Sequence, residues 1–219
     1  MTFNAPAPSD YANVYALNRA FLNLARRGQQ QFELNEFEYD RLIRLGTKQT
    51  ESLARVPFLL FSLQLHDQAR WREILLGCRN PDLFVNTDAA SSQTRELITA
   101  TVSFLRQLAH SNEYALYLIT GSHSGWPEMI GEVTYFELAT CIGRQPDLLK
   151  ARRAVAADIW AKLLYAGVNA DREVRKAAHI AVLQTLITDK TEAATAQWPL
   201  AACKTIAPLL RVAENPDQS

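Results

Sequence analysis

Cysteine is scarce in this chain. Only Cys78, Cys141 and Cys203 occur among 219 residues. An odd number of widely spaced cysteines does not form a disulfide framework, so the small secreted scaffolds that depend on one are excluded. We therefore expect reduced thiols, buried as small apolar side chains, and a cytoplasmic location. The opening residues, MTFNAPAPSD, also lack the basic and apolar stretches of a secretory signal.

The chain has no excess of charge of either sign. Lys and Arg together number 23, and so do Asp and Glu. A balanced chain has no global field that would attract it to nucleic acid or to an anionic membrane, although a local basic patch remains open. No apolar run is long enough to cross a bilayer, so we expect no membrane partner. Hydrophobic residues make up 48%, which is ample material for a packed core.

Hairpin signals are also absent, because no Asn-Gly or Asp-Gly pair stands between alternating segments. Helical periodicity is the dominant pattern, and the eight glycines and nine prolines fall mainly where helices would begin or end. The pattern predicts an all-α fold of about nine to ten helices, as an orthogonal bundle or a short helical solenoid. We expect one domain over residues 1–219, with the turn-rich stretch 77–92 as a candidate seam between subdomains.

The predicted helices begin and end at recognisable residues. One occupies 10–28, and the next begins near Asn35 and breaks before Pro57, because the residue before a proline avoids helical geometry. The apolar segment 57–65 is expected to be buried. The remaining predictions are a helix around Trp71 that ends at Gly77, and helices over about 92–109, 112–120, 127–142, 146–165, 171–186 and 191–212.

Segment 171–186 resembles the second helix of a HEAT repeat. The resemblance rests on Asp171, Val174, Arg175, Ala178 and Leu183. A solenoid needs several copies at a period of about 40 residues, and upstream only a loose echo occurs, at a different spacing. Because the resemblance covers less than a tenth of the chain, we interpret it as the ordinary pattern of a closely packed helix.

Residues 134–153 have the spacing of a helix-turn-helix motif. Ala139, Gly143 and Leu149 occupy its small, turn and apolar positions. The second helix would present side chains that contact phosphates and base edges, namely Arg144, Gln145, Lys150, Arg152 and Arg153. Pro146 argues against this arrangement, since it stands where a recognition helix would face DNA. The sequence leaves two interpretations: a DNA-binding transcription regulator, or a plain helix pair with a solvated basic face.

The stretch Gly121–Gly125 raises a question of catalysis. It places His123 between Ser122 and Ser124, shortly before Trp126. The glycine spacing is that of a nucleophile elbow, but the central residue is histidine and no parallel sheet is predicted beneath it. An enzyme of unknown class that uses this loop is one interpretation, and an interhelical turn is the other. The helix start that follows could also bind an anion or a substrate.

Metal and nucleotide sites find no support in the sequence. The four histidines, His66, His110, His123 and His179, contain no pair at helical i, i+4 spacing. No Cys-x-x-Cys, Walker loop or Gly-x-Gly-x-x-Gly occurs either, so we expect no cofactor. Without a catalytic constellation, the sequence favours a regulatory or scaffolding protein over an enzyme. Its expected partner is another protein or a second copy of itself, with nucleic acid less favoured.

Overall fold

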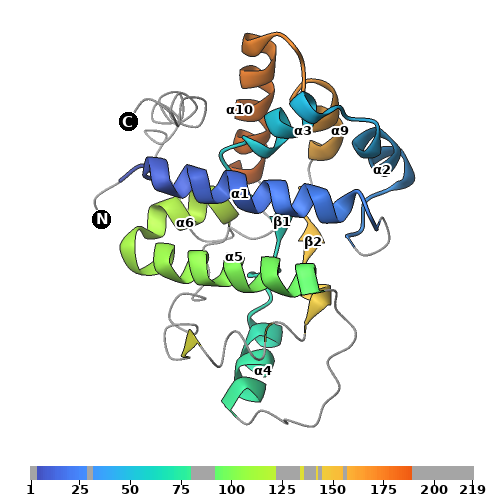
Figure 1. Cartoon of the computed structure of the whole chain (residues 1–219). Helices are drawn as coiled ribbons and strands as arrows, with labels where there is room; N and C mark the ends of the chain where they lie inside the picture. The colour runs from blue at the N-terminus through green and yellow to red at the C-terminus, as the bar shows by residue number, and fades with distance from the viewer. Residues whose placement is uncertain are drawn as a thin grey trace.

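The computed structural model describes residues 4–28, 32–79, 92–121, 134–135, 142, 145–154 and 157–188. These residues form eight α-helices, one short 3-10 helix and one two-stranded sheet (Figure 1). The helices are α1 (Pro8–Ala25), α2 (Glu36–Ile43), α3 (Thr47–Ala54), α4 (Gln68–Arg79), α5 (Ser92–Ser111), α6 (Glu113–Thr120), α9 (Ile159–Tyr165), α10 (Arg172–Thr188) and the 3-10 helix η2 (Pro146–Leu148). The strands are β1 (Phe61–Ser62) and β2 (Lys150–Ala151). The prediction of a mostly helical fold is confirmed, whereas the helices predicted over 127–142 and 191–212 lie largely or wholly outside the described residues.

Helix starts follow the capping residues that the sequence contains. The Asn35 side chain accepts a hydrogen bond from the Glu38 N–H (2.8 Å), and the Glu38 carboxylate accepts one from the Asn35 N–H (2.9 Å). This capping box fixes the first turn of α2. At α10, the Asp171 carboxylate accepts from the backbone N–H groups of Glu173 and Val174. Both predicted helix starts are confirmed, and so is the helix predicted over 112–120, which is α6.

The single helix predicted from Asn35 to Val56 is wrong, because two helices occupy this stretch. Gly46 has an extended backbone, with φ −70° and ψ 166°, and its N–H donates to the Gln49 side chain. Glycine is a poor helix former, so a new helix begins at this point more readily than elsewhere. The second helix, α3, ends at Ala54, and this agrees with the break predicted before Pro57.

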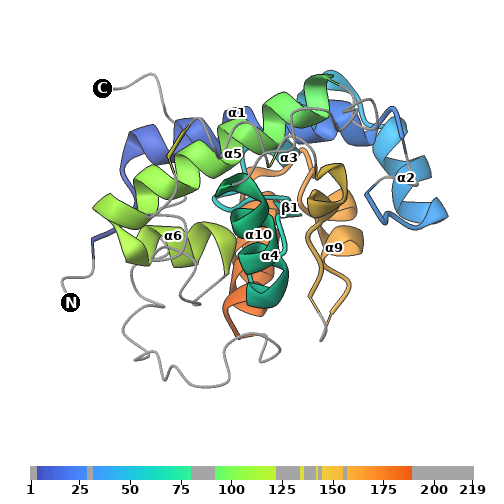
Figure 2. The same ribbon diagram turned by 90° about the horizontal axis from the view of Figure 1, so that it is seen from below.

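Helices α1 and α5 run side by side across the molecule, with α2 near one end of α1 and α6 near the other (Figures 1 and 2). Aromatic rings mark the centre of the core, where α1, β1 and α9 meet. The Phe21 ring centroid lies 5.0 Å from Phe61, 5.4 Å from Phe32 and 6.3 Å from Trp160. No helix among the described residues is both long and apolar enough to span a bilayer.

The segment 57–65 is buried, as predicted, but it crosses the core as an extended chain. Its backbone groups therefore need partners that a helix would have supplied internally. Asn18 on α1, which is fully buried, provides two of them and also bonds the end of α3. Its amide nitrogen donates to the carbonyls of Ala54 (3.2 Å) and Phe58 (2.9 Å), and its amide oxygen accepts from the Leu60 N–H (2.9 Å). One asparagine thus fixes the extended segment against α1.

The helix predicted over 146–165 is wrong in its first half. The chain instead forms η2 and then β2, which pairs antiparallel with β1 in the register Phe61 with Ala151. The Ala151 N–H donates to the carbonyl of Phe32 (3.0 Å), and the Arg152 N–H donates to that of Leu60 (2.9 Å). Bonds to distant segments therefore replace the local i to i−4 bonds of a helix, and tertiary contacts override helix propensity. Of the predicted α-helix, the part that the structure describes as α-helical is α9.

Candidate functional site

The residues predicted to contact DNA fall on an extended segment, which we call the 145–153 segment. A recognition helix is the element that a helix-turn-helix motif inserts into the major groove. Because these residues form η2 and β2, the prediction of such a motif is wrong in its second helix. Gln145, Lys150, Arg152 and Arg153 all lie on this segment, whereas Arg144 lies outside the described residues.

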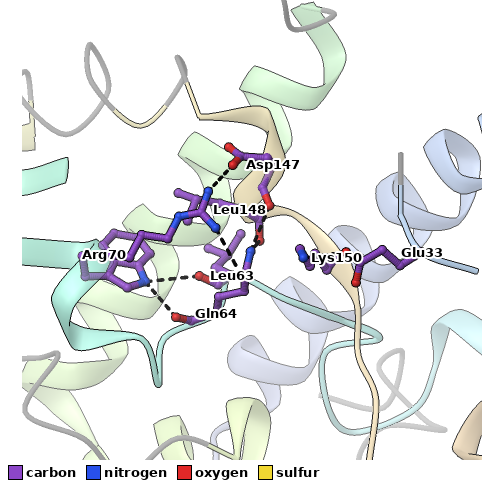
Figure 3. A network of polar contacts seen from close by, with 8 residues as sticks. Glu33, Leu63, Gln64, Arg70, Asp147, Leu148 and Lys150 are labelled. Carbon is purple, nitrogen blue, oxygen red and sulfur yellow. Dashed lines mark hydrogen bonds and ion pairs between the residues drawn. The ribbon is translucent and has the colours of Figure 1, made fainter. Parts of the chain in front are cut away.

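One end of the 145–153 segment is held by a polar network beside α4 (Figure 3). The Gln64 amide nitrogen donates to the Asp147 carbonyl (2.9 Å), and the Arg70 guanidinium pairs with the Asp147 carboxylate. Arg70 also donates to the Gln64 amide oxygen (3.3 Å), and the Trp71 indole N–H donates to the Gln64 carbonyl (3.2 Å). Gln64 has a left-handed backbone, with φ 53°. Non-glycine residues rarely adopt that conformation, so the surrounding contacts maintain it.

The other end of the segment binds the stretch before α2. Lys150 Nζ lies 2.5 Å from a carboxylate oxygen of Glu33. The Arg153 guanidinium contacts both oxygens of the fully buried Glu38, at 2.7 Å for Nη2 to Oε2, and donates to the Glu33 carbonyl (2.5 Å). A buried carboxylate is tolerated when a bidentate arginine neutralises it. Glu33 is the second non-glycine residue with a left-handed backbone, at φ 60°.

Arg152 lies between Lys150 and Arg153 in the sequence and is 6% exposed. Its Nη1 donates to the carbonyls of Ile119 (2.9 Å) and Leu59 (3.4 Å). Ile119 lies in the last turn of α6, where helix carbonyls carry partial negative charge and favour a cation. The guanidinium also occupies the space beside Gly121, where a Cβ would overlap Nη2. Arg152 therefore cannot contact a DNA phosphate without leaving the core.

The glycine-flanked loop, with Ser122, His123, Ser124 and Trp126, lies outside the described residues. The structure describes only the residue from which it departs. Gly121 ends α6 in the left-handed conformation, with φ 76°, and its N–H donates to the Tyr117 carbonyl (2.6 Å). This is the usual role of glycine after a helix. Catalysis by the loop stays a prediction.

The described histidines have structural partners. His179 is 5% exposed, and its Nε2 lies 3.0 Å from the Gly167 carbonyl. His110 bonds the Arg106 carbonyl through Nδ1 (2.9 Å). His66 lines a pocket of about 10 Å³ together with Ser62, Thr120 and apolar side chains, and the pocket has room for roughly one water molecule. Within the described ranges, no three His, Cys, Asp or Glu side chains gather closely enough to hold a metal ion.

Three buried tyrosines have shifted acidities. Burial raises the pKa of Tyr11, Tyr114 and Tyr117, because the charged phenolate is poorly solvated inside the protein. For Tyr117 the positive charge of Arg152 opposes this effect of burial on the pKa. A catalytic phenolate at neutral pH would need a lowered pKa, so these groups are suited to structural hydrogen bonds. The Tyr117 hydroxyl, for example, donates to the Ile187 carbonyl (3.1 Å).

A group of exposed rings lies where α2 meets α9. We call Phe37, Arg41 and Tyr165 the aromatic surface. Phe37 is 55% exposed and Tyr165 is 51% exposed, yet their rings stack with centroids 6.0 Å apart and an interplanar angle of 20°. The Arg41 guanidinium carbon lies 5.0 Å from the centre of the Tyr165 ring, which is a cation–π contact. The structure thus presents two rings and a cation at its surface.

Sequence reasoning missed this surface, although a signal was available. Leu42 is an apolar residue on the buried side of α2, and Phe37 falls off that side. Tyr165 likewise follows, rather than joins, the buried run of α9, which ends with Leu163 and Leu164. An aromatic residue outside the apolar stripe of its helix is the pattern to look for. Its pairing with a ring on a distant helix is visible only in three dimensions.

Comparison with known proteins returns no relative for this chain. No protein-family model matches it, and neither a curated protein nor a solved structure does. Any functional assignment therefore has to come from the chemistry of the described residues.

Proposed function

We propose that this protein has a regulatory or scaffolding role and binds another protein through the aromatic surface of α2 and α9. The observation that carries the proposal is the stacked pair Phe37 and Tyr165, each about half exposed. Protein interfaces are enriched in aromatic side chains and arginine, and depleted in lysine and acidic residues. A few such residues at the centre of an interface supply most of the binding energy.

The rigidity of α2 supports this role. The capping box at Asn35 fixes the start of the helix, and the Glu38–Arg153 pair ties its first turn to the 145–153 segment. Stacking on Tyr165 further restricts the Phe37 side chain. A surface that is already ordered loses less conformational entropy on binding, so more of its contact energy appears as affinity.

The test is a comparison of co-purified proteins. A tagged chain carrying Phe37→Ser and Tyr165→Ser should lose a specific partner that the wild-type chain retains, measured by quantitative mass spectrometry. Leu76→Ser is the matched control, because Leu76 is 65% exposed on α4, far from the aromatic surface. Thermal unfolding followed by circular dichroism verifies that both variants fold. Identical partners for all three chains, or none above background, would refute the proposal.

A further inference from the structure

We infer that the partner presents a single carboxylate next to an apolar or aromatic side chain, and that Arg41 receives this carboxylate. The inference rests on the proposed function and adds the chemistry of the ligand. Its starting point is the state of Arg41 itself. Among the described residues, the buried Arg41 Nε has no hydrogen-bond partner, and the guanidinium contacts the face of Tyr165.

The acidic side chains of α2 do not neutralise Arg41. The Glu38 carboxylate is buried against Arg153, and Asp40 lies 4.0 Å from Arg44. A guanidinium that lies over a ring still offers N–H groups at its edge, and their geometry matches the two oxygens of a carboxylate. The aromatic surface therefore combines an apolar contact with an available donor pair.

The charge pattern favours this occupant over two others. A second copy joined by two-fold symmetry would place the same surface against itself, so the two Arg41 cations would face each other near the axis. A nucleic acid strand carries a charge at every nucleotide, and the exposed carboxylates of Glu36 and Asp40 on the same short helix would repel it. A peptide with one carboxylate beside an apolar residue presents no second cation to Arg41, and it meets the repulsion of Glu36 and Asp40 with one charge rather than one at every nucleotide.

The experiment is a selection from a displayed library of random dodecapeptides against the wild-type chain and two variants. Arg41→Gln removes the donor pair, and Arg44→Gln is the matched control, since it removes a charge from the C-cap of the same helix, at a residue that already pairs with Asp40. Wild type and Arg44→Gln should enrich peptides with Asp or Glu beside Phe, Trp or Leu. Arg41→Gln should lose the acidic preference. The best peptide, made synthetically, should bind Arg41→Gln about ten-fold more weakly.

A second pair of measurements separates this inference from the proposed function. Replacing the peptide carboxylate by its amide should weaken binding to wild type about ten-fold and leave binding to Arg41→Gln nearly unchanged, since coupled partners are not additive. Binding that needs Phe37 but is insensitive to Arg41→Gln would overturn the inference alone. Failure to enrich acidic peptides would also overturn the inference. A wild-type dimer that dissociates in the Phe37→Ser variant would overturn it as well, because the occupant would then be a second copy of the chain. Enriched peptides whose binding ignores Phe37→Ser would refute both.

Discussion

At the scale of single residues, buried polar side chains hold together parts of the chain that are distant in sequence. Asn18 bonds the extended segment between α3 and β1, and Arg152 bonds the carbonyls of Leu59 in that segment and of Ile119 in α6. Removing such a group lowers the stability of the fold, because its hydrogen-bond partners are then buried and unpaired.

The replacement Asn18→Leu should therefore be strongly destabilising. It keeps a similar side-chain size but leaves the Leu60 N–H and two carbonyls without their partner. We expect a loss of about 3 kcal/mol in the free energy of unfolding, measured by urea denaturation. Asn13→Leu, at an exposed position of the same helix, is the control and should change it by less than about 0.5 kcal/mol. Equal effects at the two sites would disprove the role given to Asn18.

Replacing Gly121 and Gly77 by alanine should change the stability of the protein in opposite directions. Gly121 has φ 76°, and its added Cβ would meet the Arg152 guanidinium, so Gly121→Ala should destabilise by about 1–2 kcal/mol. Gly77 lies within α4 with open space around it, so Gly77→Ala should stabilise by about 0.5–1 kcal/mol. Thermal unfolding of the two variants measures both signs, and a stabilised Gly121→Ala would contradict the described geometry.

At the scale of elements, the 145–153 segment acts as a connector between α2, α4 and the core. Its two ends bind Gln64 and Glu33, the two non-glycine residues with positive φ among those described. Each strained residue is thus held by contacts with the same segment. The segment is therefore part of what determines where α2, and with it the aromatic surface, is placed.

Arg153 and Lys150 should differ clearly in their importance for this connector. Arg153→Ala leaves the fully buried Glu38 without its cation, and we expect a loss of about 2 kcal/mol in the free energy of unfolding. Lys150→Ala breaks a pair whose acid, Glu33, is more than half exposed, so its effect should stay below about 1 kcal/mol. Urea denaturation of both variants decides this, and a larger effect for Lys150→Ala would refute the ranking.

At the scale of the whole molecule, a tyrosine cluster joins the two ends of the chain's described part. Tyr11 of α1 packs with Tyr114 and Leu118 of α6 and with Ile187 of α10. Burial raises the pKa of both tyrosines above their ordinary value of 10.0, and the charge of Asp10 adds to the effect at Tyr11. The folded protein thus keeps these phenols protonated at a pH where the unfolded chain ionises them.

The sign of the resulting pH dependence follows directly. Below pH 10 both states are protonated, so the contribution to stability is complete. As the pH rises above 10, ionisation favours the unfolded chain and stability falls. We expect the free energy of unfolding, measured in urea between pH 8 and about 11.5, to decline less steeply in Tyr11→Phe than in wild type. If the free energy of unfolding declined in parallel in the two proteins, Tyr11 would not contribute to the pH dependence.

Local sequence signals located much of the helical architecture correctly. Asn35 and Asp171 began helices and Pro57 ended one, because capping and proline geometry act within a few residues. The same kind of reasoning failed over 146–154, where helical spacing gave way to η2 and β2. Of the predicted DNA contacts, Arg152 and Arg153 turned out to bond other parts of the chain, and the His123 loop remains untested.

The helical class and many of the points where helices begin and end could be predicted from the amino-acid sequence, since these depend on apolar periodicity and on short-range hydrogen bonds. The tertiary structure alone decided that Asn18, Arg152 and Glu38 are buried, and that Phe37 meets Tyr165 in solvent. The burial of these side chains and the contact of the two rings depend on residues that lie far apart in the chain. Their energies appear only after the chain has brought them together, so no local pattern could have revealed them.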